Sequence, residues 1–221
     1  GVVTWGEKGY GGDSSDVQSQ LKGVVTICST GFAFAAKLAN GSVVTWGNTF
    51  NGGDIRSVQA RLKGVDTICS TYTAFAAKLT GGGVVTWGDA VDGGDSRSVQ
   101  ARLKGVDTIC STYSAFAAKL TGGGVVTWGG ARTGGDSHSV QARLQGVDTI
   151  FSNMGAFAAK LQDGGVVTWG GARYGGDSHS VQTQLQAVDT ICSTYSAFAA
   201  KLADGRVVTW GDARNGGDSR S

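Results

Sequence analysis

The sequence predicts a mainly β protein: a β-propeller built from 41-residue repeats, with a short outer helix in each blade. Six tryptophans recur every 41 residues, each within the string VVTWG, and 38 of the 221 residues are glycine. Short apolar runs also alternate with turn residues. Because a unit of this size cannot bury its own apolar face, neighbouring copies must stack. An open arc of blades and a stacked β-solenoid are the alternative arrangements. The tryptophans are Trp5, Trp46, Trp87, Trp128, Trp169 and Trp210.

Three strands are expected in each copy. In the third copy they cover Val106 to Thr112, Ala115 to Leu120 and Val125 to Trp128. The glycines from Gly122 to Gly124 predict a hairpin turn between the last two strands. In AFAAKL, period-two alternation places the phenylalanine and leucine on one face, and the small alanines suit closely approaching sheets. The valines of VVTW favour a strand that is buried on both faces.

The segment SVQARLKGV between the copies fits two structures. Val99, Leu103 and Val106 have helical spacing, and Asp95 or Ser98 can cap such a helix. An edge strand with period two also fits. The good helix formers in the middle of the segment favour the short outer helix.

Composition and charge exclude two classes of partner. The 19 basic and 17 acidic residues give a net charge of +2 and form no basic cluster, so we expect no nucleic-acid binding. No run of 18 apolar residues is present, so we expect no membrane span. The chain opens inside a repeat without an initiator methionine, which suggests a processed product or a piece of a longer polypeptide.

The order ICST, AFAAKL, VVTWG and GGD is similar to the regulator-of-chromosome-condensation repeat, and the similarity covers nearly the whole chain. The array also resembles short, regular arrays predicted in dinoflagellate algae. The family resemblance implies a seven-bladed propeller closed by strands from both chain ends. Seven such units would take about 287 residues, so the resemblance suggests part of a larger propeller or an open arc. The chain departs from the family in its shorter repeat, its lack of proline, and CSTY in place of a Gly-Gly-x-His-type turn.

Repeated loops on a rigid frame favour a non-catalytic scaffold that binds another protein or a multi-subunit assembly. The turn after the first strand carries an aromatic position, and tyrosine suits an interface. The fourth copy has the most divergent turn, which predicts a contact there. A row of lysines, one in each copy, is a second candidate because it would attract an acidic partner. The candidate contact residues are Tyr72, Tyr113, Met154, Tyr195, Lys37, Lys78, Lys119, Lys160 and Lys201.

Three other functions fit the pattern. One is a structural accessory subunit of a large photosynthetic or cytoskeletal complex in an alga. Another is a multivalent lectin with a shallow sugar site in each blade. Guanine-nucleotide exchange on a small GTPase is implied by the family, although the member that does this uses an inserted wedge and this array has no insertion. An active site brings different catalytic groups together at one place, whereas a repeat places the same residues in every copy. We therefore expect no enzymatic activity and no cofactor.

The remaining polar residue types have structural interpretations. One apolar position holds cysteine in four copies and Phe151 in another, which predicts buried free thiols and favours a reducing intracellular compartment. Arginine (Arg97 or Arg220) replaces His138 and His179 in other copies, so the histidines are expected to be exposed rather than metal ligands. The tryptophans are expected in the core. The cysteines are Cys28, Cys69, Cys110 and Cys192. The recurrent Gly-Gly-Asp is expected to form Asx turns or helix caps at Asp13, Asp54, Asp95, Asp136, Asp177 and Asp218.

Overall fold

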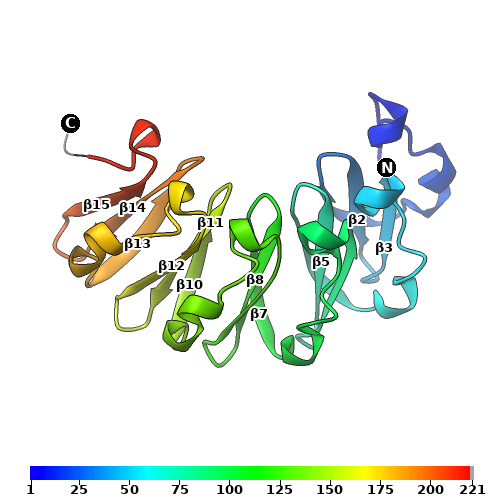
Figure 1. The fold of residues 1–221 in the computed structure, drawn as a ribbon. Coiled ribbons are helices and arrows are strands. Elements are labelled where there is room, and N and C mark those ends of the chain that lie inside the picture. Colours follow the sequence, from blue (N-terminus) through cyan, green and yellow to red (C-terminus); the bar gives the residue numbers. More distant parts are fainter. Residues whose placement is uncertain (220–221) are drawn as a thin grey trace. The chain divides into compact units, whose positions relative to one another are not determined.

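The computed structural model describes residues 1–219, which form two compact units. Unit 1 covers Gly1–Ile109, and unit 2 begins at Cys110. Each unit is a row of antiparallel sheets made from consecutive strands (Figure 1).

Over residues 1–219, fifteen strands form five three-stranded sheets, with the strands in sequence order in each sheet. The first seven strands are β1 (Val24–Ser29), β2 (Ala33–Leu38), β3 (Val43–Gly47), β4 (Val65–Ser70), β5 (Ala74–Leu79), β6 (Val84–Gly88) and β7 (Val106–Ser111). The other eight are β8 (Ala115–Leu120), β9 (Val125–Gly129), β10 (Val147–Ser152), β11 (Ala156–Leu161), β12 (Val166–Gly170), β13 (Val188–Ser193), β14 (Ala197–Leu202) and β15 (Val207–Gly211). The three expected strands per copy are confirmed, with ends displaced by at most one residue in the third copy.

The outer segment of each copy is a short helical turn, and the edge-strand alternative is wrong. It is a 3₁₀ turn, because the amide of the leucine that ends it donates to the residue three positions earlier, as Leu103 does to Gln100. That leucine is buried, which anchors the turn to the sheet. The outer turns are η2 (Ser15–Gln20), η4 (Gln59–Arg61), η6 (Gln100–Arg102), η8 (His138–Arg143) and η10 (His179–Gln184). Short helical turns also follow the VVTWG segments at η1 (Lys8–Tyr10), η3 (Thr49–Gly53), η5 (Ala90–Gly94), η7 (Ala131–Thr133), η9 (Ala172–Tyr174) and η11 (Ala213–Asn215).

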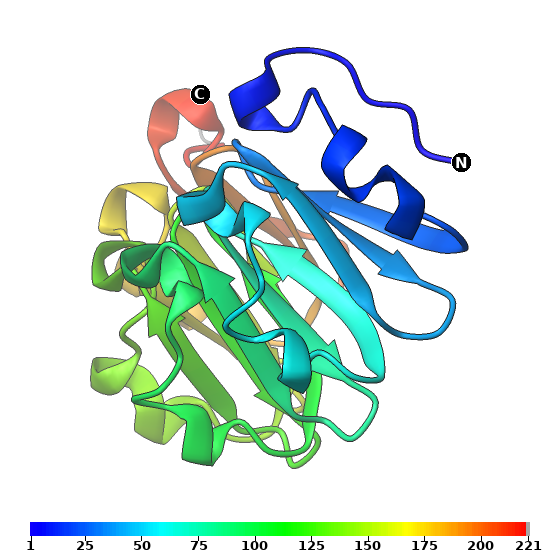
Figure 2. The same ribbon diagram turned by 90° about the vertical axis from the view of Figure 1, so that its right-hand side faces the viewer.

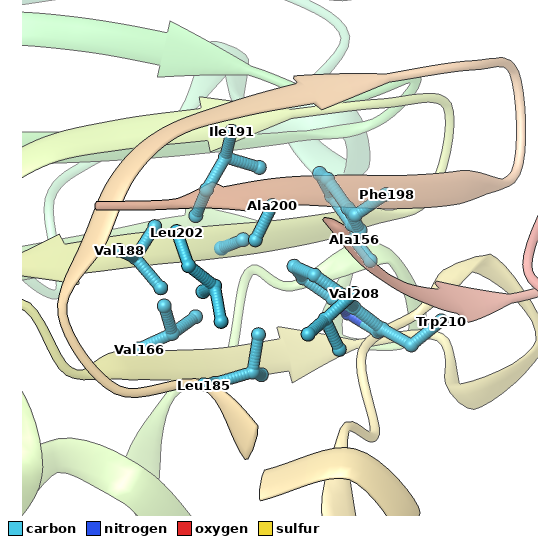
Figure 3. Packing of buried hydrophobic residues seen from close by; sticks show 11 residues of the cluster. Ala156, Val166, Leu185, Val188, Ile191, Phe198, Ala200, Leu202, Val208 and Trp210 are labelled. Atoms are coloured by element: carbon cyan, nitrogen blue, oxygen red, sulfur yellow. The ribbon is translucent and has the colours of Figure 1, made fainter. Parts of the chain in front are cut away.

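The core of each sheet is a phenylalanine stacked on the tryptophan of the next strand. In the last sheet the Phe198 and Trp210 rings lie 5.4 Å apart, and the Trp210 indole N–H donates to the carbonyl of Gly175 at 3.0 Å. Leu185 from the outer turn and Ala156 from the neighbouring sheet close this cluster (Figure 3). Each large apolar side chain buried in this way contributes about 1.5–3 kcal/mol of transfer free energy.

The central strand of a sheet is covered on both faces. Ala156, Phe157, Ala158 and Ala159 of β11 are all fully buried, because sheets of unit 2 pack against each face of it. Small alanines permit that close approach, as the sequence predicts.

Neighbouring sheets are also joined by repeated hydrogen bonds. The amide that begins one sheet donates to a glycine carbonyl in the preceding hairpin turn, as in Val65 to Gly41 at 3.0 Å and Val188 to Gly164 at 2.9 Å. The same bond at each junction fixes the register of one sheet against the next.

The first VVTWG segment departs from this pattern, so the prediction that all six tryptophans are core is wrong for Trp5. Residues 1–6 form no strand, since no hairpin within residues 1–219 pairs with them, and Trp5 is 84% exposed. Figure 2 shows this N-terminal stretch as an extended segment followed by helical turns. It is held by a hydrogen bond between the Thr4 and Ser14 hydroxyls and by another from Gln18 to the Val2 carbonyl.

Candidate functional site

At one end of every sheet, two segments lie together: the turn between the first and second strands, and the loop that follows the third strand. We call this end the turn edge. Its turns are residues 30–32, 71–73, 112–114, 153–155 and 194–196. The loops that follow the sheets are residues 48–51, 89–92, 130–133, 171–174 and 212–215, and residues 7–10 are the matching loop after the first VVTWG segment.

Each turn holds its loop by a side-chain hydrogen bond. The Thr71 hydroxyl donates to the carbonyl of Asp92 at 3.0 Å, and in the fourth sheet the Asn153 amide donates to the carbonyl of Tyr174 at 2.7 Å. The threonine oxygen also accepts from a backbone amide of its own turn, as Thr71 does from Ala74. These bonds make the turn edge a rigid frame for whatever side chains project from it.

The copies differ on this edge, and they also differ in the hairpin turns at the opposite end of the sheets (ANGS, TGGG, TGGG, QDGG and ADGR). The loop sequences in chain order are EKGY, NTFN, DAVD, GART, GARY and DARN, whereas the flanking VVTWG and GGD are the same in all six copies. The turns also vary (TGF, TYT, TYS, NMG and TYS), whereas AFAAKL does not. The strands that build the sheets are therefore constant, whereas the turns and loops at their ends vary.

The structure places the predicted contact residues of the turns on this edge. Tyr72, Tyr113 and Tyr195 are 41%, 40% and 60% exposed, and Met154 is half-buried. In unit 2 the turns are joined through the backbone, since Tyr113 donates to Met154 at 2.9 Å and Met154 to Tyr195 at 3.3 Å.

Unit 1 adds three aromatic residues that the sequence interpretation missed, Tyr10, Phe32 and Phe50. The Phe32 ring meets Tyr72 edge-on at 5.0 Å and Tyr10 at 5.3 Å. Phe50, on the next loop, is 81% exposed. The signal that would have found them is the variation between copies at these positions.

The divergent fourth turn has a reason within the fold. A Cβ on Gly155 would lie 2.5 Å from the ring of Tyr174, and one on Gly171 would lie 2.9 Å from the same ring. Tyr174 therefore fits only because both neighbours are glycines. In the preceding sheet, Ser114 and Thr133 occupy the matching positions and share a hydrogen bond of 2.7 Å.

The lysine row lies away from the turn edge, toward the other end of the strands, and four aspartates offset most of the charge of its five lysines. Lys78 pairs with the Asp66 carboxylate at 2.8 Å and donates to the carbonyl of Asp107 at 2.9 Å. Lys160 does the same with Asp148 and Asp189. Hydrogen bonds from the lysines lower the pKa values of the Asp66, Asp148 and Asp189 carboxyls. Of the remaining members, Lys37 donates to the backbone carbonyl of Asp66 and Lys119 to that of Asp148. Lys201 donates to the Asp189 carboxylate.

The four cysteines are free, as predicted, but they are less buried than predicted. Cys28 and Cys110 are half-buried, and each thiol donates to an isoleucine carbonyl of the next sheet, at 3.2 and 3.3 Å. Burial raises the pKa of both thiols. Cys192 is exposed, because no sheet within the described residues lies beyond its strand.

The histidines and the recurrent aspartates match their structural interpretations. His138 and His179 are exposed, and the part of the chain that the structure describes contains no cluster of metal-ligating side chains. Asp136 and Asp177 accept the histidine backbone amides at 2.8 Å in Asx turns. Arg220 lies outside the described residues. The same turn forms at Asp13, Asp54 and Asp95.

Rows of small antiparallel sheets with this strand order are blades of the β-propeller class. Solved structures of that class resemble this chain. Human WBSCR16 matches with a TM-score of 0.54 and 16% identity, covering 89% of this chain and 64% of that one. Yeast RCC1 (Prp20), solved bound to Kap60, matches with a TM-score of 0.56 and 15% identity over 89% of this chain and 57% of that one. The CRINKLY WD40 ectodomain of the Arabidopsis thaliana receptor kinase ACR4 matches with a TM-score of 0.52 and 12% identity over 85% and 65%.

The chain thus has the repeat fold of the regulator-of-chromosome-condensation type, and it spans less than two thirds of the length of these structures. No family model matches the sequence, and no curated protein does. None of the helices in residues 1–219 is long and apolar enough to cross a membrane.

Proposed function

We propose that the protein is a non-catalytic scaffold for protein–protein interaction and that its turn edge carries the contact. The observation that supports this most is that the copies differ on an edge that also displays exposed aromatic side chains, among them Tyr72, Tyr113 and Tyr195. A repeat whose strands are the same and whose edge residues differ presents a varied surface on a fixed frame.

The side chains on that edge suit the role. Tyrosine and other aromatic residues bring large contact area at a small cost in side-chain entropy, and they are enriched at interface hot spots. Tyr72 and Phe32 in unit 1, and Tyr113 and Tyr195 in unit 2, are held by packing or backbone bonds yet remain accessible. Yeast Prp20p, which has a similar fold, has been characterised for binding to Gsp1p and histones, so the fold itself is compatible with protein partners.

The other functions have less support. Five tryptophans are buried and cannot offer a stacking surface to sugars, which removes the main aromatic group of a lectin site. Nucleotide exchange through an inserted wedge has no counterpart in an array whose loops keep one length. An accessory subunit of a large assembly differs from the scaffold only in the number of partners.

A photo-cross-linking residue at Tyr113 tests the proposal. We expect it to capture a discrete polypeptide in extract from the native source, whereas the same residue at Ser139, exposed on the outer turn of unit 2, should not. Capture of several subunits of one complex would favour the accessory-subunit version. Equal capture from both positions, or none from either, would contradict the proposed role of the turn edge.

A further inference from the structure

One position of the turn edge is arginine in three successive loops. Arg132, Arg173 and Arg214 are the third residues of GART, GARY and DARN, and all three are exposed. The matching residues in unit 1 include Phe50 and Val91, which are 81% and 74% exposed. A position that holds phenylalanine, valine or arginine in solvent makes no packing demand, so packing does not explain the arginines.

These arginines carry more charge than their neighbours neutralise. Arg173 and Arg214 share one carboxylate, that of Asp212, at 3.2 and 3.1 Å. The Asp212 side chain is 7% exposed, and hydrogen bonds from Arg214 and then Arg173 hold its pKa well below the usual value. Arg132 has no acidic partner within residues 1–219, because glycine occupies the position matching Asp212 in the next loop. Three arginines against one aspartate leave the loops of unit 2 with a net charge of +2.

The same loops have the opposite charge in unit 1. There Glu7, Asp89 and Asp92 stand against Lys8, which gives a net charge of −2. Since the whole chain carries only +2, the loops of the two units differ in charge more than the overall composition suggests. Aromatic side chains accompany the arginines in unit 2, where the half-buried Tyr174 ring lies 6.4 Å from the exposed Tyr195 ring.

We infer that the turn edge of unit 2 binds an acidic, extended segment of a partner protein, whose carboxylates are taken by Arg132, Arg173 and Arg214. The inference rests on the proposed function and names the class of its partner. Guanidinium groups bind carboxylates through paired N–H donors, and the tyrosines supply apolar contact beside them. A nucleic acid fits less well, since tight binding to a phosphate backbone engages some 6–10 basic contacts.

Fluorescence anisotropy with a synthetic probe tests the inference. The probe is a labelled peptide of about a dozen residues in which glutamate alternates with alanine, and its lysine counterpart is the reference. The variant R132E/R173E/R214E should weaken binding of the glutamate peptide by about tenfold or more. The matched control R56E/R97E/R143E changes the net charge equally at exposed arginines of the outer segments and should bind as the unaltered chain does. Urea midpoints confirm that both variants are folded.

Several outcomes would overturn the inference: no binding of the glutamate peptide, equal loss in the control variant, or tighter binding of a single-stranded oligonucleotide of the same charge. If Tyr113 captures a partner but the peptide does not bind, the inference fails and the scaffold function stands. If the peptide binds as expected and no turn-edge position captures a polypeptide, the three arginines bind acidic peptides as inferred, but the proposed scaffold function fails.

Discussion

Replacing Gly155 with serine should destabilise the protein, and replacing Tyr174 with threonine as well should restore much of the loss. In G155S the new Cβ lies 2.5 Å from the Tyr174 ring, about 1 Å inside ordinary carbon contact. The ring cannot move aside freely, since Gly171 packs against it as well. Overpacking of this kind costs about 1–3 kcal/mol. We expect about 2 kcal/mol for G155S.

The second substitution recreates an arrangement already present in the preceding sheet. Y174T alone removes a half-buried ring and should cost about 1–2 kcal/mol. In G155S/Y174T the serine and threonine occupy the positions of Ser114 and Thr133, which share a hydrogen bond of 2.7 Å. The double variant should therefore be more stable than the two single losses predict, by about 1–3 kcal/mol of coupling.

Urea unfolding followed by far-ultraviolet circular dichroism measures all four chains, with the midpoint and slope fitted separately. G124S is the matched control, because its Cβ meets no atom closer than 3.8 Å and Ser42 fills the same position in another copy. It should leave the midpoint unchanged. If the loss in G155S/Y174T equals the sum of the losses in G155S and Y174T to within about 0.5 kcal/mol, the packing argument is refuted.

Four further results are expected. Phe157→Ala removes a fully buried ring stacked on its tryptophan and should cost about 3–5 kcal/mol in urea unfolding, whereas Phe50→Ala should cost almost nothing; similar losses would contradict the assigned core. Met154→Tyr should weaken capture of the partner and leave the urea midpoint intact, and unchanged capture would remove the fourth turn from the interface. Cys192 should react with a maleimide before Cys110, whose thiol is partly buried and has a raised pKa, as peptide mapping would show; the reverse order would count against the assigned burial. Stability should be constant above about pH 5 and fall as the pH drops below it, because lysine hydrogen bonds lower the folded-state pKa of the carboxyls; a flat profile down to about pH 2 would contradict the pairing at Asp66, Asp148 and Asp189.

The strands could be predicted because their signals are local. Alternation in AFAAKL and the glycine turn before VVTWG are enough to place β8 and β9 to within a residue. The outer segment was harder, since helical and extended spacing both fit its apolar residues. In the structure the segment makes a short 3₁₀ turn that ends at a leucine, such as Leu103, and this leucine is buried against the sheet.

The candidate site was only partly predictable. The tyrosines of the turns are visible as an aromatic position in otherwise polar strings. The arginines recur visibly every 41 residues, but their shared partner Asp212 and the role of Gly155 are not visible, because both depend on which segments lie side by side in the fold. Tyr174 follows Gly155 by 19 residues, and nothing in the intervening sequence indicates that they touch. Trp5 shows that an identical local sequence is not enough to predict burial. It lies in the same VVTWG string as the five buried tryptophans, but it is exposed because its segment pairs with no second strand in residues 1–219.

The identical junctions between sheets, such as Val65 to Gly41 and Val188 to Gly164, have an evolutionary consequence. Because each sheet meets its neighbours through the same bonds, unequal recombination that duplicates or deletes one 41-residue copy leaves every remaining junction intact. Point mutations in the four residues after VVTWG then alter the exposed loop without touching those junctions. Such a gene can change the length of the array and the chemistry of its edge as separate inherited traits.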